Sequence, residues 1–269
     1  MAQNCECDHV LDNLSATNVN IVAASSFDYN PGDVFCIRGG QIAGLRFLGF
    51  RGTSEQPLTF INCDGAVLIS ETAHAGISFI ESAHIHLTGT GDVDVEYGFH
   101  VTQSGANAMG INIRAFSSDF EIDHIEIENT GFAGIMAKTD PRCDNPQTWR
   151  VNGFVLRNLN IHHNYIHHTN GEGIYVGYAG GYRVNSNVTC AGQARFGHWL
   201  EDVDVHHNLI ESTGWDGIQM SLVRTNGQIH DNIILNWATA SEFYQDFVMN
   251  ILVGPYEVNK TYIRSSGGT

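Results

Sequence analysis

Carboxylate and polar side chains recur at matching positions of a repeated segment. Glu172 and Asp216 each stand directly before a Gly-Ile pair, and Tyr175 and Gln219 stand at the second position after that glycine. If the repeats stack at the spacing of neighbouring β-strands, the two carboxylates lie roughly 5 Å apart. Such a pair is compatible with a retaining glycosidase, or with a shared site for a divalent cation such as Ca²⁺.

The same region contains residues suited to proton transfer next to the carboxylate of a uronic acid. Tyr175 or Lys138 could act as the base while Arg183 neutralises the carboxylate. Aromatic faces pack on pyranose rings, and charged or amide groups bind sugar hydroxyls. We therefore predict a sugar-binding groove, with the following substrate-binding residues: Asp140, Arg142, Tyr178, Arg183 and Gln219. The alternative is that these are turn residues and scattered surface aromatics.

A second set of candidate residues follows the first strand of the same repeat. Asp123, His162 and His206 occupy one outward column of that strand, and His230 continues it. Carboxylates and imidazoles at rung spacing could bind a divalent metal or act as acid and base. The alternative is a ladder of polar side chains exposed to solvent.

A further column consists of Asn164, Asn208 and Asn232 at the following turn. Asparagine tolerates left-handed backbone, and its side-chain amides stack in hydrogen-bonded ladders. We predict a structural role for this column.

These positions are related because one pattern is written three times, at 120–135, 159–174 and 203–218, with a shorter copy at 227–236. Each copy alternates apolar and polar residues, which is typical of a strand, and ends in Gly-Ile. A fixed period of a few tens of residues is typical of a stacked repeat array.

The spacing of the repeats predicts the architecture. Asn208 and Asn232 are 24 residues apart, and Gly76 and Gly98 are 22 apart. A coil of 22–24 residues with short strands and no helix is the rung of a parallel β-solenoid. Two longer intervals leave room for inserted loops at 137–153 and 177–199, stacked on one side. We expect one domain, with an N-terminal cap at 1–30, coils at 31–236, and last strands and a tail at 237–269.

The composition restricts the partners. With 13 basic against 29 acidic side chains, the formal net charge of the 269 residues is −16, which argues against nucleic acid. It also disfavours a polyanionic polysaccharide, unless a local basic patch or a bound cation screens the charge. No apolar run approaches the roughly 20 residues of a membrane span. We expect a monomer.

The six cysteines favour an oxidising compartment. Cys143 and Cys190 each fall in one of the two predicted loops, so a disulfide between the loops and buried free thiols are both open interpretations. The N-terminal residues Met1–Cys5 lack the basic and apolar segments of a secretion signal. We expect a secreted or cell-surface protein whose signal is absent from this sequence.

A resemblance to a known class rests on two motifs. The run from Pro31-Gly-Asp33 to Gly52-Thr-Ser-Glu-Gln-Pro57 resembles the opening coils of alginate-lyase and chondroitinase-B-like polysaccharide lyases. The Asn-x-Ile and Gly-x-Gly-Ile repeats resemble those of bacterial pectate-lyase-like proteins. The resemblance implies a right-handed, single-stranded parallel β-helix, but not one activity, because many chemistries share this fold.

The chain departs from these enzymes in its basic residues. No segment after the opening coils resembles the lysine- and arginine-containing catalytic core of the lyases. Asp140-Pro141 is similar to the start of the Asp-Pro-His signature of mannuronan epimerases, but Arg142 replaces the histidine. Two functions therefore stay open: a polysaccharide lyase, epimerase or hydrolase with its groove under the loops, and a non-catalytic extracellular module that binds glycans or serves as an adhesive or structural rod.

Overall fold

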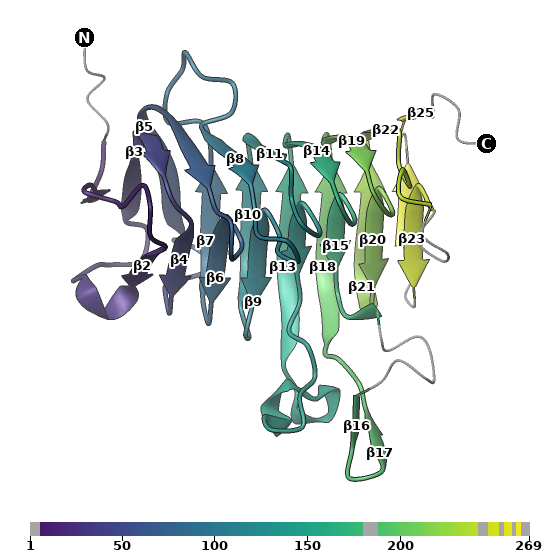
Figure 1. Ribbon diagram of the computed structural model, residues 1–269. Coiled ribbons are helices and arrows are strands. Elements are labelled where there is room, and N and C mark those ends of the chain that lie inside the picture. Colours follow the sequence, from purple (N-terminus) through teal and green to yellow (C-terminus); the bar gives the residue numbers. More distant parts are fainter. Residues whose placement is uncertain (1–5, 180–187, 242–246, 253–255, 260–261, 265–269) are drawn as a thin grey trace.

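The computed structural model describes residues 6–179, 188–241, 247–252, 256–259 and 262–264. In this part of the chain, short strands wind into successive rungs with three sheet faces, which we call A, B and C (Figure 1). The helices among these residues are three 3₁₀ turns: η1 (Ala24–Ser26), η2 (Pro146–Thr148) and η3 (Arg150–Asn152). None of the described helices is long and apolar enough to cross a bilayer.

Each face is a ladder of parallel strands. Face A contains β3 (Val34–Ile42), β5 (Leu58–Ser70), β7 (Ala83–Thr88), β10 (Ser118–Asp123), β13 (Val155–His162), β18 (Trp199–His206), β21 (Val223–His230) and β24 (Tyr256–Asn259), with β1 (His9–Leu11) on the edge of β3. Face B contains β8 (Phe99–Gln103), β11 (Ile125–Glu128), β14 (Tyr165–Thr169), β19 (Leu209–Thr213), β22 (Ile233–Leu235) and β25 (Tyr262–Arg264). The long strand β5 joins faces A and B, because its two halves pair with β7 and β8.

Face C is a separate sheet. It contains β2 (Asn20–Ala23), β4 (Leu45–Leu48), β6 (Ile77–Ile80), β9 (Ile111–Arg114), β12 (Ile135–Ala137), β15 (Ile174–Val176), β20 (Ile218–Ser221) and β23 (Met249–Leu252). Strand pairing begins inside the predicted cap, since β1 pairs with β3 and β2 with β4. The last strands, β23 to β25, pair with the preceding rung.

The strand register confirms the predicted repeats. Ile161 on β13 pairs with Val205 on β18, and Tyr175 on β15 pairs with Gln219 on β20. The described pairings between rungs are parallel, and the antiparallel pair is the hairpin of β16 (Val188–Cys190) and β17 (Gln193–Arg195). The chain is therefore a parallel β-helix, as predicted.

The interior is built from the inward side chains of the three faces. One continuous apolar cluster runs from Leu11 to Ile234. Its N-terminal half holds stacked phenylalanines, with ring centroids of Phe35 and Phe60 5.0 Å apart and those of Phe47 and Phe79 4.8 Å apart. Large buried aromatic rings contribute strongly to stability, so this column anchors the first rungs.

The glycine of each Gly-Ile motif is required by close approach between rungs. A Cβ on Gly173 would lie 2.6 Å from the carbonyl oxygen of Gly217, and a Cβ on Gly134 would lie 2.6 Å from that of Gly173. Real Cβ atoms do not approach a carbonyl so closely. The recurring glycine therefore marks where the turn into face C packs directly on the next rung.

The asparagine column forms the predicted ladder. Asn164 donates from Nδ2 to Oδ1 of Asn208 at 3.0 Å, and Asn208 donates in the same way to Asn232 at 3.0 Å. All three side chains are buried. The structural role predicted for this column is confirmed.

The two long intervals between Gly-Ile motifs, from Gly134 to Gly173 and from Gly173 to Gly217, each contain a loop that leaves the end of a face C strand, as predicted. In Figure 1 the two loops extend from the same side of the molecule. A disulfide between Cys143 and Cys190 joins them, which decides between the two interpretations of these cysteines. The loops also meet through Arg150, whose guanidinium lies 3.8 Å from the centre of the Trp199 ring. At their bases, the backbone N–H of Thr139 donates to Nε2 of the buried His198 at 2.9 Å.

Candidate functional site

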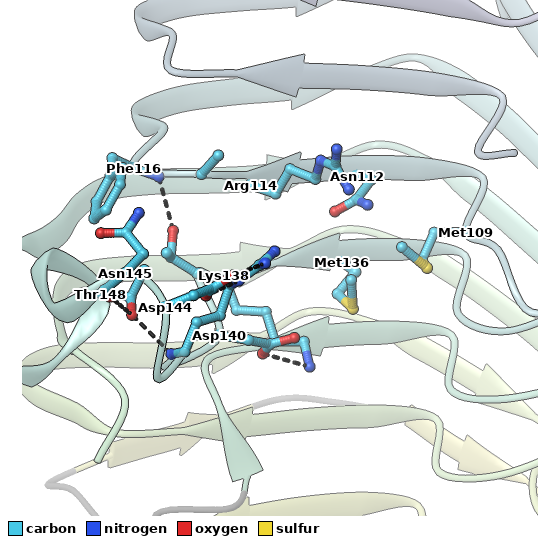
Figure 2. A pocket seen from close by; sticks show the side chains of 13 residues that line it. Met109, Asn112, Arg114, Phe116, Met136, Lys138, Asp140, Asp144, Asn145 and Thr148 are labelled. Carbon is cyan, nitrogen blue, oxygen red and sulfur yellow. Dashed lines mark hydrogen bonds and ion pairs between the residues drawn. The ribbon is translucent and has the colours of Figure 1, made fainter. Parts of the chain in front are cut away.

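A hollow of about 600 Å³ lies on face C against the first loop (Figure 2). Strand β9 and the residues around it form one wall, and β12 with the first loop forms the other. The side chains that line it are those of Met109, Asn112, Arg114, Ala115, Phe116, Met136, Lys138, Thr139, Asp140, Arg142, Asp144, Asn145 and Thr148. The hollow therefore lies under the first predicted loop, and of the predicted site residues its lining contains Lys138, Asp140 and Arg142.

Three basic side chains converge on this hollow. Arg114 is the last residue of β9. Lys138 lies beside it on the next rung, where its backbone N–H donates to the carbonyl of Ile113 at 3.0 Å. Arg142 comes from the first loop and forms a bidentate ion pair with Asp144. Burial lowers the pKa of the Arg114 guanidinium, and repulsion by the positive charges of Arg46 and Arg142 lowers it further. A guanidinium still stays charged at neutral pH, so the hollow is locally basic.

Lys138 is held by an acid and two aromatic rings. Its Nζ lies 3.0 Å from Oδ1 of Asp140, 4.5 Å from the centre of the Tyr175 ring and 5.5 Å from that of Tyr178. Burial would lower the pKa of this ammonium group, but Tyr175 and Asp140 outweigh burial and raise it. Lys138 is therefore a fixed positive charge at neutral pH, which suits charge neutralisation or proton donation.

Tyr175 lies behind Lys138. Its side chain points away from the solenoid interior, as predicted, but it is only 7% exposed because it packs with Met109, Met136 and Phe132. Its hydroxyl oxygen accepts a hydrogen bond from the backbone of Ala179 at 3.4 Å. Burial raises the pKa of the phenol, although the charge of Lys138 opposes that effect. In the free protein Tyr175 is thus a protonated phenol.

Glu172 and Asp216 lie one rung apart, as the repeat predicts, since the N–H of Gly173 donates to the carbonyl of Asp216. Both side chains are buried, with 1% and 0% exposed, and so they do not line the open hollow. Burial raises the pKa of Glu172 to about 7, and the neighbouring Asp216 contributes to the rise. Oε2 of Glu172 has no hydrogen-bond partner, whereas Asp216 accepts from the backbone of Phe247 and from Asn250. An acid that titrates near neutrality is a candidate for function.

The other predicted substrate-binding residues are dispersed. Asp140 and Arg142 line the hollow, and Tyr178 lies beside Lys138. Gln219 points outward but is buried, with its Oε1 3.4 Å from Nδ2 of Asn250. Arg183 lies outside the described residues.

Asn112 and Arg114 also line the hollow, although neither was predicted as a site residue. Asn112 is buried and its Oδ1 has no partner, which leaves an amide oxygen available beside the hollow. A signal was present, because the alternation of Ile111-Asn-Ile-Arg114 places both polar residues outward.

Of the three predicted metal residues on face A, Asp123 and His162 lie close together, but His206 does not join them. His162 Nε2 lies 4.0 Å from Asp123 Oδ2 and 2.9 Å from Glu121 Oε1, while Asp123 also pairs with His86 and His124. His206 points at Asn160 instead, with its Nε2 3.0 Å from the amide oxygen. The described residues whose ligand atoms lie within 4.8 Å of one another form different groups on this side, namely His86 with Glu121 and Asp123, and His207 with His230 and Asp231.

Comparisons with known proteins do not assign the chain to a family. No protein-family model matches the chain, and no curated protein matches it either. Among solved structures, the chain is similar to an alginate lyase from Paenibacillus sp. str. FPU-7, at 14% identity and a TM-score of 0.44. That similarity covers 93% of this chain and 98% of the other. The assignment of a parallel β-helix rests on the strand pairing described above.

Proposed function

We propose that the face C hollow binds an acidic polysaccharide and that the protein transfers a proton at the carbon next to a uronate carboxylate, as a lyase or an epimerase does. The observation that carries this proposal is the convergence of Arg114, Lys138 and Arg142 in one hollow of a protein whose formal net charge is −16. A local basic patch is the condition under which so acidic a chain accepts a polyanion.

The chemistry assigns a role to each of these groups. Arg114 offers a planar fork that can bind a carboxylate through two hydrogen bonds. The ammonium of Lys138, held by Asp140, stabilises the negative charge that develops on the carboxylate when the neighbouring proton leaves. Tyr175 is the candidate for proton transfer, since the positive charge of Lys138 stabilises a phenolate. Tyr175 is buried behind Lys138 and does not line the hollow, so this role requires Lys138 and the packed methionines to move when the sugar binds.

Lys138→Ala tests this proposal. We expect the rate of product formation from a polyuronate to fall by about 10²–10⁴-fold, because both the charge at the carboxylate and the support of Tyr175 are lost. The measurement is the ultraviolet absorbance of new unsaturated chain ends, together with the ratio of C5 epimers in the polymer.

Arg157→Ala is the matched control, since this exposed arginine lies on face A in an ion pair with Glu201. It should leave the rate unchanged. Equal rates for wild type and Lys138→Ala would contradict the assigned role.

The alternative is a non-catalytic glycan-binding module. It is favoured by one observation, namely that the pKa values of both Lys138 and Tyr175 are raised, so neither is a ready base at neutral pH. This alternative predicts that polyuronates bind, that Lys138→Ala weakens binding, and that no product forms across a panel of acidic polysaccharides.

We also propose that the protein works outside the reducing cytosol. Disulfides persist in oxidising compartments, and both Cys7–Cys36 and Cys143–Cys190 are formed. Detection of the native protein in culture medium or on the cell surface tests this part of the proposal.

A further inference from the structure

A group of imidazoles and carboxylates lies on face A, apart from the face C hollow. It is formed by the outward side chains of three successive rungs: His86 on β7, Glu121 and Asp123 on β10, and His162 on β13. The register places His86 next to Glu121, and Asp123 next to His162. The four positions therefore form a staircase across the sheet, with Glu121 and Asp123 on the middle rung and His86 and His162 on the two rungs beside it.

The ligand atoms of these side chains point toward one another. His86 Nε2 lies 2.5 Å from Asp123 Oδ2, and His162 Nε2 lies 2.9 Å from Glu121 Oε1 and 4.0 Å from Asp123 Oδ2. Ligand atoms of His86, Glu121 and Asp123 all lie within 4.8 Å of one another. Ligand atoms of a tetrahedral zinc site are about 3.4 Å apart, as bond lengths near 2.1 Å require, so shifts of roughly 1 Å would suffice for His86, Glu121 and Asp123. His162 adjoins this group through Glu121 and Asp123, and it has to move further toward His86 to complete the site.

We propose that His86, Glu121, Asp123 and His162 bind one divalent transition-metal ion of the zinc class. Two imidazole nitrogens and two carboxylate oxygens form a donor set that suits zinc, whereas calcium prefers oxygen ligands alone. The site joins three rungs, so the ion holds them together from outside. A hollow of about 370 Å³ lined by His86 and Glu121 provides access.

The surroundings orient the ligands. Nδ1 of His162 lies 2.8 Å from Nδ1 of His163, which gives the second ring nitrogen a partner when Nε2 binds the metal. Asp123 is 3% exposed, and its other oxygen accepts hydrogen bonds from Thr88 at 2.7 Å and His124 at 2.6 Å. Such contacts fix a metal ligand in place before the ion arrives.

His206 lies next to the proposed site but is not one of its ligands. It stacks on His162 with ring centroids 4.8 Å apart and belongs to the same column, but its Nε2 faces the amide oxygen of Asn160. An amide is a weaker ligand for zinc than a carboxylate. His206 therefore continues the column without adding a ligand to the proposed site.

The experiment uses the intact disulfide-bonded protein, stripped with EDTA and titrated with ZnCl₂ by calorimetry, with MgCl₂ and CaCl₂ in parallel. We expect about one zinc ion per chain, no comparable binding of magnesium or calcium, and a higher midpoint of thermal unfolding with zinc, because an ion that binds only the folded state stabilises it. His86→Gln combined with His162→Gln should abolish the stoichiometric zinc and the thermal shift.

Two variants serve as controls. His206→Gln changes the same column one rung further and should leave zinc binding intact. Glu121→Gln, at a partly exposed position, should weaken zinc binding by about 10–100-fold while the fold is retained by circular dichroism.

Three outcomes would overturn the proposal. The first is the absence of stoichiometric zinc in the wild-type protein. The second is unchanged zinc binding in the folded Glu121→Gln or His86→Gln/His162→Gln variants. The third is loss of zinc in a His207→Gln/His230→Gln variant alone, which would place the ion at the other group.

Discussion

Glu172 holds its proton near neutrality because its surroundings oppose ionisation. The side chain is buried, Oε2 has no hydrogen-bond partner, and Asp216 lies on the neighbouring rung. The pKa of about 7 in the folded protein compares with 4.5 for the free side chain. A folded-state pKa above the unfolded value means that this group stabilises the fold fully below pH 4.5 and that this contribution is lost as the pH rises through 7.

Glu172→Gln should remove this pH dependence. The neutral amide keeps the shape of the protonated acid, so the variant should be more stable than wild type at pH 8 by about 3 kcal/mol, with little difference near pH 4. Urea unfolding at several pH values measures the difference. The exposed Glu96→Gln is the control and should give parallel curves. A wild type that follows Glu172→Gln at every pH would show that Glu172 ionises freely.

Sequence reasoning located several residues of the hollow but not their environment. Lys138, Asp140 and Arg142 were found because they follow a recurring Gly-Ile strand. Arg114 was overlooked, since the strand that carries it precedes the three similar copies. The burial of Tyr175 depends on packing against turn residues such as Phe132, which periodicity within one strand does not encode.

At the scale of the elements, the hydrogen-bonded ladder of Asn164, Asn208 and Asn232 stabilises the turn between faces A and B. Besides its contacts with Asn164 and Asn232, Asn208 donates to the carbonyls of Ile161 and His206. The ladder thus satisfies backbone groups that the sharp turn leaves without strand partners.

Asn208→Ala should therefore destabilise the protein strongly. The change removes the acceptor of the Asn164 backbone N–H and the side-chain donor to the two carbonyls, and one unsatisfied buried group costs about 1–3 kcal/mol. We expect a loss of at least about 3 kcal/mol in the free energy of unfolding, measured by urea titration. Asn18→Ala, at an exposed position, should change it by less than about 0.5 kcal/mol. A loss near that of the control would exclude a structural role for the ladder.

The length of a coil was predictable from the spacing of the repeats, and so were the places where the loops leave the rod. Intervals of 39 and 44 residues between successive Gly-Ile motifs exceed one coil, and both surpluses follow a face C strand. The pairing of Cys143 with Cys190 could be stated only as one of two interpretations, because spacing alone does not give the distance between two loops.

At the scale of the whole molecule, the charge is unevenly distributed. The chain has 29 acidic and 13 basic side chains, yet three of the basic ones meet at one hollow. The same hollow holds two carboxylates, Asp140 and Asp144, so its lining carries a small positive excess on a strongly acidic chain, and under the proposed function an anionic polymer approaches against the overall charge and binds at this one place. Salt screens both effects over about 10 Å at 0.1 M, so moderate ionic strength reduces the repulsion on approach more than the short contacts within the hollow.

The short strand β1 closes the N-terminal end of the rod, and the disulfide between Cys7 and Cys36 fastens it there. A parallel β-helix can grow by adding strands at its ends, and a three-residue edge strand offers an incoming strand far less backbone to pair with than the nine-residue β3 that it covers. Breaking the disulfide with Cys7→Ser should release β1 and uncover the backbone of β3. Light scattering should then reveal slow end-to-end growth into filaments, while the parent protein stays clear.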